Sequence, residues 1–467
     1  MDKTIEFFKK LSKIPRPSGK EEKVAQFLIN FAKEHNLEYF TDNTYNVIIK
    51  KPSNQPNCNR TLILQAHTDM VCEKNAGVNI NFDKDSITLD ENDDFIFAKG
   101  TTLGADNGIG LSMILSILDD ENLKIPNIEA VFTAQEETTM QGAIDLDFTL
   151  LKGEHLLSID GTDEGKIEVS SAGMAVVKNA KTFERENANS KLCYKISILG
   201  LQGGHSGTEI NSNRLNAIKL LFKFLNKYKQ NINFVSIIGG GKSNAIPREC
   251  VCEVIFNKVD TTSLQEELNT FCCNYLENEP NICGKIEPNT KFIPNVLSLK
   301  DSENLIDFVN NHNNGVLVWS DLNPNFPIVS NNFANIQLNK EKLEVIISLR
   351  SSVKKLESEH LSNLFSLAEK HGLSFDVLST APFFERKQNS YLQELCCKNY
   401  EKLFNEKAVL NDVHAGLEGG VFAGKRQNLD ICVIAPNIYD AHSPKERVSK
   451  TSITKTYKWL ESIVESF

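Results

Sequence analysis

Histidines and carboxylates follow several of the apolar, β-rich segments of this chain. In an open α/β sheet, ligands bind at the carboxyl ends of strands, where side chains from separate strands converge. The pattern therefore predicts one site built from residues far apart in sequence. The residues concerned are His67, Asp69, Asp106, Glu136, Glu137, Asp160 and His442.

Two histidines and three carboxylates of this set suit zinc, and manganese or cobalt would also be accepted. Five ligands are too many for one catalytic ion. If one carboxylate bridges, each of two ions gains three protein ligands and keeps an open position for the water that hydrolysis needs. His67 and Asp69 stand at i and i+2, on one side of an extended segment, so Asp69 can orient His67. Glu136, left over beside a ligand, could carry the water's proton to the leaving amine.

Each of these residues also has an ordinary explanation when it is taken alone. His67 with Asp69 could be a surface pair, and Asp106 could cap the helix that follows it. Two adjacent carboxylates, Glu136 and Glu137, are unfavourable at a strand end unless a cation or a proton compensates them, but they would be unremarkable in a solvated loop. The coincidence of so many near strand ends favours a metal centre.

Apolar runs alternate with helical patterns over much of the chain, which indicates an α/β sheet with helices on its faces. Ser18 with Glu21 matches a capping box ahead of an amphipathic helix. A second helix is expected at 107–118. The expected strands lie at 45–49, 61–66, 128–134, 155–159 and 429–435.

The middle of the chain has a different order of predicted strands and helices, which predicts a second domain. From about Lys191 it reads as strand, loop, a helix at 213–228 and a Gly-rich turn, and a further strand and helix cover 343–370. A chain of 467 residues also exceeds what one core usually supports. We therefore expect a catalytic metal-binding domain at 1–182 and 382–467, with an inserted domain at 183–381.

Composition excludes several classes of function. A net charge of -10 and a pI near 5.6 disfavour binding to nucleic acid. No apolar run approaches the length of a membrane span, and the N-terminus lacks the pattern of a signal peptide. The 11 cysteines form no Cys-x-x-Cys pair, so we expect free thiols in a reducing cytoplasm.

Five motifs together resemble the aminoacyl-histidine dipeptidases, also called Xaa-His or cytosolic non-specific dipeptidases. These enzymes are a branch of the di-zinc metallopeptidase family that includes carboxypeptidase G2 and aminoacylase. The resemblance begins at Ile14-Pro15-Arg16-Pro17-Ser18-Gly19 and extends almost to the C-terminus. The motifs are Leu64-Gln65-Ala66-His67-Thr68-Asp69-Met70-Val71-Cys72, Gly100-Thr101-Thr102-Leu103-Gly104-Ala105-Asp106-Asn107-Gly108, Gly203-Gly204-His205-Ser206-Gly207, Ser243-Asn244-Ala245-Ile246-Pro247 and His442-Ser443-Pro444.

The resemblance implies a mixed-sheet catalytic domain of α/β class with an inserted α+β lid. It implies that a glutamate-activated water hydrolyses a small, carnosine-like dipeptide, and it leaves a homodimer open. By this resemblance Asp106 bridges two zinc ions, His67 and Asp160 complete one site, Glu137 and His442 complete the other, Glu136 is the general base and Asp69 orients His67.

In the lid, the resemblance implies that His205 polarises the scissile carbonyl and stabilises the oxyanion. Asn244 and Arg350 are expected to contact the substrate, where an arginine fork suits a terminal carboxylate. Gly416 is expected in a substrate-binding loop of the catalytic domain. A lid joined through two strands also implies closure about a hinge.

Three departures from the family pattern bear on specificity, and one of them is the unusual Thr138-Thr139 after the paired glutamates. Gly419 stands where a cysteine is expected, and Ala435 where a glycine is expected, although all proposed ligands are intact. A tripeptidase, an unspecific dipeptidase or an N-acyl-amino-acid deacylase therefore remains open, as does a metal-binding scaffold without catalysis. The run 239–243 suggests a phosphate-binding loop, but Ser236 stands where that pattern needs glycine, so a tight turn is expected.

Overall fold

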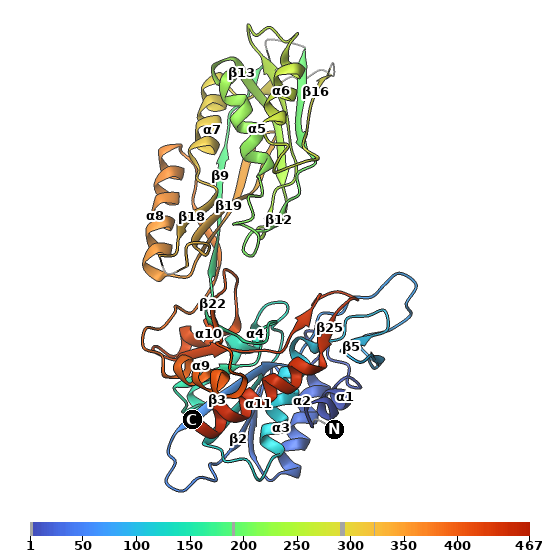
Figure 1. Cartoon of the computed structure of the whole chain (residues 1–467). Helices are drawn as coiled ribbons and strands as arrows, with labels where there is room; N and C mark the ends of the chain where they lie inside the picture. Colours follow the sequence, from blue (N-terminus) through green and yellow to red (C-terminus); the bar gives the residue numbers. More distant parts are fainter. Residues whose placement is uncertain (1–2, 189–191, 290–294, 322) are drawn as a thin grey trace. The chain divides into compact units, whose positions relative to one another are not determined.

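A computed structural model of the chain describes residues 3–188, 192–289, 295–321 and 323–467, and divides into two compact units (Figure 1). The first unit comprises Met1–Ser171, Phe383–Val413 and Leu417–Phe467. The second comprises Ala172–Pro382 and His414–Gly416. The first unit is thus assembled from parts of the chain that precede and follow the second.

The first unit is built on a mixed eight-stranded sheet in the order β1-β2-β6-β3-β7-β23-β8-β22. Its central neighbours β6, β3, β7 and β23 run parallel, so their carboxyl ends lie at one edge. The strands are β1 (Glu38–Thr41), β2 (Val47–Lys51), β3 (Thr61–His67), β6 (Asn127–Thr133), β7 (His155–Ser158), β8 (Lys166–Ser170), β22 (Val409–Asp412) and β23 (Asp430–Val433).

The central strands are apolar on both sides because helices cover both faces of the sheet. In β3, Leu62 and Leu64 face one core while Ile63 faces the other, as the two-residue period of a strand requires. The helices and short helical turn of this unit are α1 (Lys3–Leu11), α2 (Glu22–Glu34), α3 (Ala105–Asp119), α4 (Gln141–Asp145), η1 (Phe148–Leu150), α9 (Tyr391–Phe404), α10 (Glu418–Lys425) and α11 (Lys450–Ser466).

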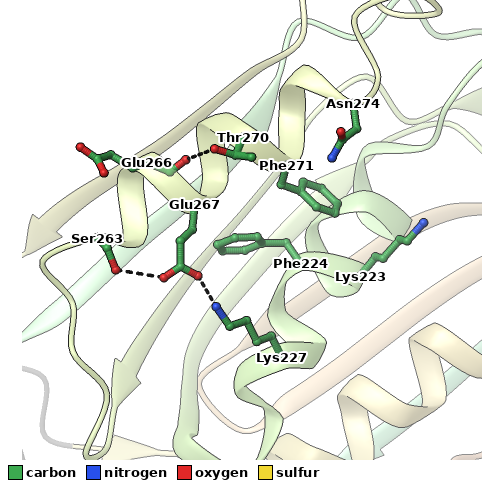
Figure 2. Close-up of a pocket in the computed structure, with 9 residues that line it drawn as sticks. All are labelled: Lys223, Phe224, Lys227, Ser263, Glu266, Glu267, Thr270, Phe271 and Asn274. Carbon is green, nitrogen blue, oxygen red and sulfur yellow. Dashed lines mark hydrogen bonds and ion pairs between the residues drawn. The ribbon is translucent and has the colours of Figure 1, made fainter.

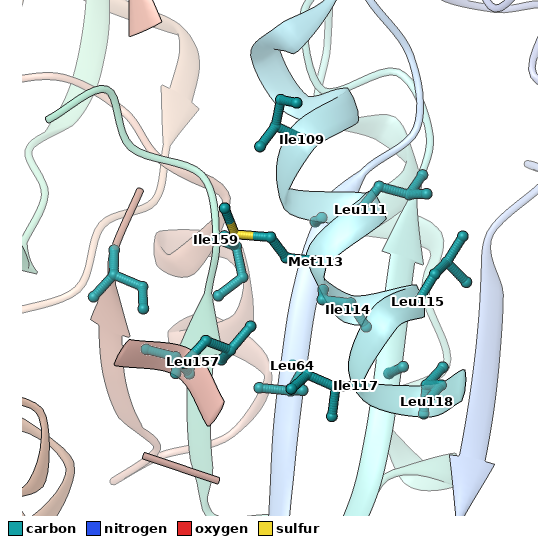
Figure 3. Close-up of a cluster of buried hydrophobic side chains, with 14 of the residues drawn as sticks. Leu64, Ile109, Leu111, Met113, Ile114, Leu115, Ile117, Leu118, Leu157 and Ile159 are labelled. Carbon is teal, nitrogen blue, oxygen red and sulfur yellow. The ribbon is translucent and has the colours of Figure 1, made fainter. Parts of the chain in front are cut away.

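Helix α3 is the buried centre of the larger core (Figure 3). It is apolar around most of its circumference, and Ile114 and Ile117 are fully buried together with Leu64 and Leu157 from the sheet. A helix that is apolar all round must be buried on all sides. The start of α3 is therefore held firmly against the edge where the parallel strands end.

The predicted capping box at Ser18 and Glu21 is wrong. Helix α2 begins at Glu22, and its N-cap Glu21 makes no side-chain capping bond. The hydroxyl of Ser18 instead donates to Asp69 Oδ2 at 2.7 Å, and Glu21 Oε1 accepts the backbone N–H of Gln135 at 3.1 Å. Both side chains bind to loops that follow strands, at Asp69 and at Gln135. A rule for local helix capping cannot predict such distant contacts.

A small sheet of four strands, in the order β24-β25-β5-β4, completes the first unit. It joins a segment near the C-terminus to one near residue 95, because β25 pairs with β5. Its strands are β4 (Leu89–Glu91), β5 (Phe95–Ala98), β24 (Ile438–Tyr439) and β25 (Arg447–Ser449).

The second unit is an α+β structure on a nine-stranded sheet, in the order β16-β11-β15-β13-β19-β20-β9-β21 with β18 beside β19. Two small pairs, β10 with β17 and β12 with β14, accompany it. The strands are β9 (Gly173–Thr182), β10 (Glu186–Asn187), β11 (Cys193–Leu199), β12 (Gly204–His205), β13 (Ile232–Gly240), β14 (Ala245–Ile246), β15 (Cys250–Phe256), β16 (Cys283–Asn289), β17 (Asn295–Val296), β18 (Gly315–Trp319), β19 (Pro327–Asn339), β20 (Lys342–Ser351) and β21 (Asp376–Ala381).

Helices of the second unit pack on its sheet around a separate core that includes Phe222, Phe234 and Phe333. The predicted domain boundary after residue 182 is too late, because the second unit begins at Ala172 and β9 pairs with β20 from Gly173 onward. The helices and the helical turn are α5 (Ala217–Leu225), η2 (Asn226–Asn231), α6 (Leu264–Cys273), α7 (Leu299–Asn311) and α8 (Lys354–Lys370).

The Gly-rich run 239–243 forms a turn between β13 and β14, with no helix after it, as the rejection of a phosphate loop predicted. Gly240 has φ +71° there, and a Cβ on it would lie 2.0 Å from the carbonyl oxygen of Ala334. All 11 cysteines lie in the described residues and are free thiols. Within the described ranges, the helices are too short or too polar to cross a membrane.

Candidate metal centre

The five predicted ligands lie together at one edge of the first unit's sheet. His67 Nε2 is 3.0 Å from Asp106 Oδ1 and 3.4 Å from Asp160 Oδ1. His442 Nε2 is 3.3 Å from Asp106 Oδ2 and 3.0 Å from Glu137 Oε2. Asp106 therefore stands between the two histidines, with one carboxylate oxygen directed at each.

Separate elements deliver these side chains to the same place. His67 is the last residue of β3, Glu137 follows β6, and Asp160 follows β7. Asp106 lies at the start of α3, where its φ and ψ are not helical. It does not cap that helix, because the N-cap is Gly104 and the Asp106 carboxylate is directed at the histidines.

The arrangement fits a divalent ion. One ligand atom each from His67, Asp106 and Glu137 lie within 4.8 Å of one another. Glu137 Oε1 is buried and has no hydrogen-bond partner in the described structure, although a buried carboxylate oxygen is costly without one. Imidazole nitrogens and carboxylate oxygens are ligands of zinc and related metals. The first unit thus contains a candidate metal site.

Asp69 connects the histidine to the loop that carries the paired glutamates. Its Oδ1 is 3.4 Å from His67 Nδ1, the ring nitrogen that faces away from the cluster. The same carboxylate accepts the backbone N–H of Glu136 at 3.0 Å and of Glu137 at 3.2 Å. Asp69 can therefore fix both the ring of His67 and the strand end after β6.

The carboxylates of the cluster differ in their tendency to ionise. Burial raises the pKa of Glu136 to about 7, with the charges of Glu137 and Asp106 adding to it and that of His67 opposing it. Burial also opposes ionisation of Asp106, but hydrogen bonds with His442 and His67 outweigh it and hold its pKa below the usual range. A carboxyl group whose pKa is raised beside another whose pKa is lowered is the pattern of a general acid-base residue.

Four further residues support the cluster and were missed by the sequence reasoning. Asn107 Nδ2 donates to Asp160 Oδ1 at 2.7 Å, and Arg16 Nη1 donates to the backbone oxygens of Thr68 at 3.0 Å and Asp69 at 2.9 Å. Arg16 and Ser18 fall in a motif used for the resemblance, yet nothing in that motif says what they contact. The four residues are Arg16, Ser18, Asn107 and Glu446.

Within the second unit, three of the predicted substrate residues come from neighbouring segments. His205 of β12 pairs with Ala245 of β14, the residue after Asn244. Ser348, two residues before Arg350 in β20, donates to the carbonyl that precedes Asn244 at 2.8 Å. Burial, followed by the positive charge of Arg350, lowers the pKa of His205.

Arg350 is 5% exposed, and its Nε has no partner in the described structure. Burial lowers the pKa of this guanidinium to about 10, which leaves it charged at neutral pH. A buried, positively charged and incompletely bonded side chain can bind an anion such as a carboxylate.

The expectation that Gly416 belongs to the catalytic domain is wrong. The segment His414–Gly416 is part of the second unit. The backbone N–H of Ala172 donates to the carbonyl of Ala415 at 2.9 Å, and His414 Nε2 is 2.7 Å from Ser330 Oγ. These contacts with β19 and the start of β9 hold a short stretch of the returning chain in the second unit, which a single boundary near residue 382 could not anticipate.

A surface pocket of about 540 Å³ lies between α5 and α6 in the second unit (Figure 2). None of the predicted site residues lines it. Of the two carboxylates that line it, Glu266 and Glu267, the second already accepts from Lys227, Tyr228 Oη and, at 2.9 Å, Ser263 Oγ. The Glu267 carboxylate is therefore already hydrogen-bonded to three side chains. This pocket is not the candidate active site.

Comparison with known proteins places the whole chain among peptidases. Residues 63–466 match the sequence profile described as peptidase family M20/M25/M40. The cytosol non-specific dipeptidase of Escherichia coli strain K12 is 31% identical over 473 residues, covering 98% of this chain and 96% of that protein.

Two solved structures are similar to this chain over nearly its whole length. An aminoacylhistidine dipeptidase from Vibrio alginolyticus superposes with a TM-score of 0.92 at 31% identity, over 99% of this chain and 96% of the other. An aminopeptidase PepT from Bacillus cereus, at 15% identity and a TM-score of 0.57 over 99% and 98% of the two chains, shares the fold.

Proposed function

The chain belongs to peptidase family M20/M25/M40, and from that premise we propose that it is a two-zinc dipeptidase that hydrolyses carnosine-like Xaa-His dipeptides. It is a peptide hydrolase by family. The observation that carries the finer proposal is the meeting of His67, Asp106, Glu137, Asp160 and His442 at one sheet edge. Two relatives that are dipeptidases by name, each 31% identical to this chain, support the same substrate class.

In this proposal Asp106 would be a ligand of both ions, because each of its oxygens faces a different histidine. His67 and Asp160 complete one site, and Glu137 and His442 complete the other. Zinc ions bound there would supply Lewis-acid activation of a water molecule and of the scissile carbonyl. Manganese or cobalt could take the same ligands.

Glu136 acts as the general base and then as the general acid. It accepts a proton from the attacking water and delivers it to the amine that leaves when the peptide bond breaks. Burial favours the protonated form of Glu136, which helps this carboxyl group to hold the proton between the two steps. Asp69 keeps His67 in one orientation throughout.

The second unit supplies the substrate-binding residues in this proposal. The His205 imidazole would donate to the oxyanion, and Arg350 would bind the terminal carboxylate of the dipeptide through its guanidinium fork. Asn244 and Gly416 would contact the peptide backbone. The lid-like role of this unit and its closure about a hinge stay predictions.

The proposed setting is the cytoplasm, where the free thiols would remain reduced. The partner is a small peptide, and the acidic surface disfavours nucleic acid. A homodimer stays open.

The test combines metal analysis with a substrate panel on the wild type and on Glu136→Ala. We expect about two metal ions per chain in both proteins, because Glu136 is not a ligand. Turnover of β-Ala-His should fall by a factor of about 10²–10⁴ in the variant, the usual contribution of a general acid-base residue. A wild-type protein that binds no metal, or a variant that keeps full turnover, contradicts the proposal.

The same panel separates the alternatives. Faster hydrolysis of Leu-Gly-Gly than of β-Ala-His would indicate a tripeptidase, and preference for N-acetyl-methionine would indicate a deacylase. Metal binding without hydrolysis of any of the three would favour a non-catalytic scaffold.

A further inference from the structure

Helix α3, which carries Asp106, has no capping side chain of its own. Its N-cap is Gly104, at φ +70°, and Asp106 and Asn107 have non-helical φ and ψ, so the backbone N–H groups of residues 103–106 belong to a turn ahead of the regular helix. Four consecutive N–H groups instead donate to Glu446, more than 300 residues further along the chain. Glu446 Oε2 accepts from Leu103 at 2.8 Å and Gly104 at 3.0 Å, and Oε1 accepts from Ala105 at 2.8 Å and Asp106 at 3.3 Å.

Glu446 also belongs to the segment that carries His442. Its own N–H donates to the carbonyl of Ser443 at 3.0 Å, which closes a turn directly after the histidine. From Arg447 onward the chain is fixed by the pairing of β25 with β5. One buried carboxylate, 3% exposed, therefore ties the Asp106 turn to the His442 turn.

A buried cation holds the same turn from its other side. Arg16 is 2% exposed and donates through Nη2 to the carbonyl of Gly104. Its Nη1 donates to the carbonyls of Thr68 and Asp69, directly after His67. The segments that bear His67, Asp106 and His442 are thus joined by two buried charges whose partners are backbone groups.

Such charges are expensive to bury, and their retention calls for a reason beyond stability. A serine or aspartate at an N-cap accepts from only one or two N–H groups. It would also not connect the turn to the segment of His442. Glu446 makes that connection. If Asp106 and His442 share a metal ion, the distance between their side chains must stay constant.

We infer that Glu446 is a positioning residue that sets Asp106 against His442 and thereby determines how tightly the metal pair is held. This inference rests on the proposed function, since it assumes that the two side chains share a metal. Within the described residues, the hydrogen bonds of the Glu446 carboxylate come from backbone N–H groups and not from the side chain of a proposed ligand. Its effect reaches the ions through the backbone of residues 103–106.

The test is Glu446→Gln, measured by titrating zinc into the metal-free full-length protein. The amide oxygen of glutamine can still accept two of the four N–H groups. Its NH₂ group is itself a donor, so it cannot accept from the other two. We expect zinc affinity to fall about 10–100-fold for at least one ion, the usual effect of losing a group that orders a ligand. With zinc well below saturation, kcat for β-Ala-His should fall while KM changes little, and added zinc should restore kcat.

A matched control is Glu129→Gln in the same unit. Glu129 is also 3% exposed and accepts backbone N–H groups from Lys152 at 2.8 Å and Gly153 at 3.0 Å, but it connects to none of the proposed ligands. We expect this variant to lose thermal stability and to keep the zinc affinity of the wild type.

Equal zinc affinity in Glu446→Gln and the wild type overturns the inference, as does an equal loss in both glutamine variants. If Glu446→Gln does not fold, Glu446→Asp serves, because it keeps the charge and all four acceptor sites but falls short of the turn. It should show the same loss of zinc affinity, and wild-type affinity in it overturns the inference. A wild-type protein that takes up no zinc rejects the proposed function, whereas a wild type that binds zinc beside an unaffected variant rejects only the role of Glu446.

Discussion

At the level of single residues, the protein buries ionisable groups in two different ways. In the first unit, Asp106, Glu136 and Asp160 are gathered with histidines, so that the state of each depends on the charges of the others. In the second unit, His312 is buried without a carboxylate partner among the groups that shift its pKa. In the proposed function the first arrangement serves chemistry, whereas the second makes the free energy of unfolding depend on pH.

Burial lowers the pKa of His312 to about 3, with Lys219 adding to the shift and a backbone hydrogen bond at Asn313 opposing it. An unfolded histidine has a pKa near 6.5, so between about pH 6.5 and 3 the unfolded chain binds a proton that the folded chain refuses. The free energy of unfolding therefore falls as the pH drops below about 6.5, by roughly 1.4 kcal/mol per pH unit for this group.

His312→Gln should reduce this loss by about 2 kcal/mol between pH 6.5 and 5. Urea unfolding of both proteins at the two pH values measures the difference. Since burial also lowers the pKa of His414 to about 3, part of the pH dependence should remain in the variant. Identical pH dependence in wild type and variant would show that His312 is protonated in the fold.

At the level of elements, the start of α3 approaches the end of β7 more closely than a side chain permits. A Cβ on Gly110 would lie 2.2 Å from the carbonyl oxygen of Ile159 and 2.2 Å from Asn107 Oδ1. Asn107 in turn bonds to Asp160. The glycine therefore lets the helix meet the strand end where two of the proposed ligands converge.

Gly110→Ala should cost about 1–3 kcal/mol of unfolding free energy, because the helix must shift to relieve the contact. Gly424→Ala is the control, since Gly424 lies in α10 of the same unit and a Cβ there meets nothing within 4 Å. That change should be neutral or stabilise by about 0.4–1 kcal/mol. Equal denaturation midpoints for the two variants would show that the helix moves aside freely.

Much of this architecture could be predicted from the sequence, because its central strands and α3 are strongly patterned. The runs at 61–66 and 128–134 became β3 and β6, and the helix expected at 107–118 is α3. The run at 155–159 likewise became β7, so His67, Glu137 and Asp160 do lie at or just after the ends of strands. Periodic burial is a local signal, and it was sufficient here.

The remaining contacts could not be predicted, because they join segments without any local pattern. Ser18 looked like a helix cap, and only the fold shows that its hydroxyl serves Asp69. The sequence around Glu446 is polar and has no motif, yet its carboxylate accepts the backbone N–H groups of the turn that carries Asp106. The return of residues 414–416 to the second unit likewise depends on tertiary contacts alone.

At the level of the whole molecule, all five proposed ligands belong to the first unit. Ions that bind only the folded state stabilise it by about 2.7 kcal/mol per site at a free concentration one hundred times Kd. Removing metal should therefore lower the melting temperature of the first unit and leave that of the second unchanged.

Calorimetry of the full chain with and without a chelator tests this expectation. The two tryptophans help to assign the transitions, because Trp459 is buried in the first unit and Trp319 is exposed in the second. In Trp319→Phe, fluorescence reports the first unit alone. A chelator that shifts both transitions equally, or neither, would contradict the assignment of the ions to the first unit.

The interruption of the first unit by the second also has a consequence for how the protein is made. Strand β23 lies between β7 and β8, and its residues, like His442 and Glu446, follow the whole of the second unit along the chain. A ribosome therefore completes the second unit while the nascent first unit still lacks a central strand of its sheet. In the proposed function, the site that needs His442 cannot be complete until the second unit and the segment that carries His442 have both been synthesised.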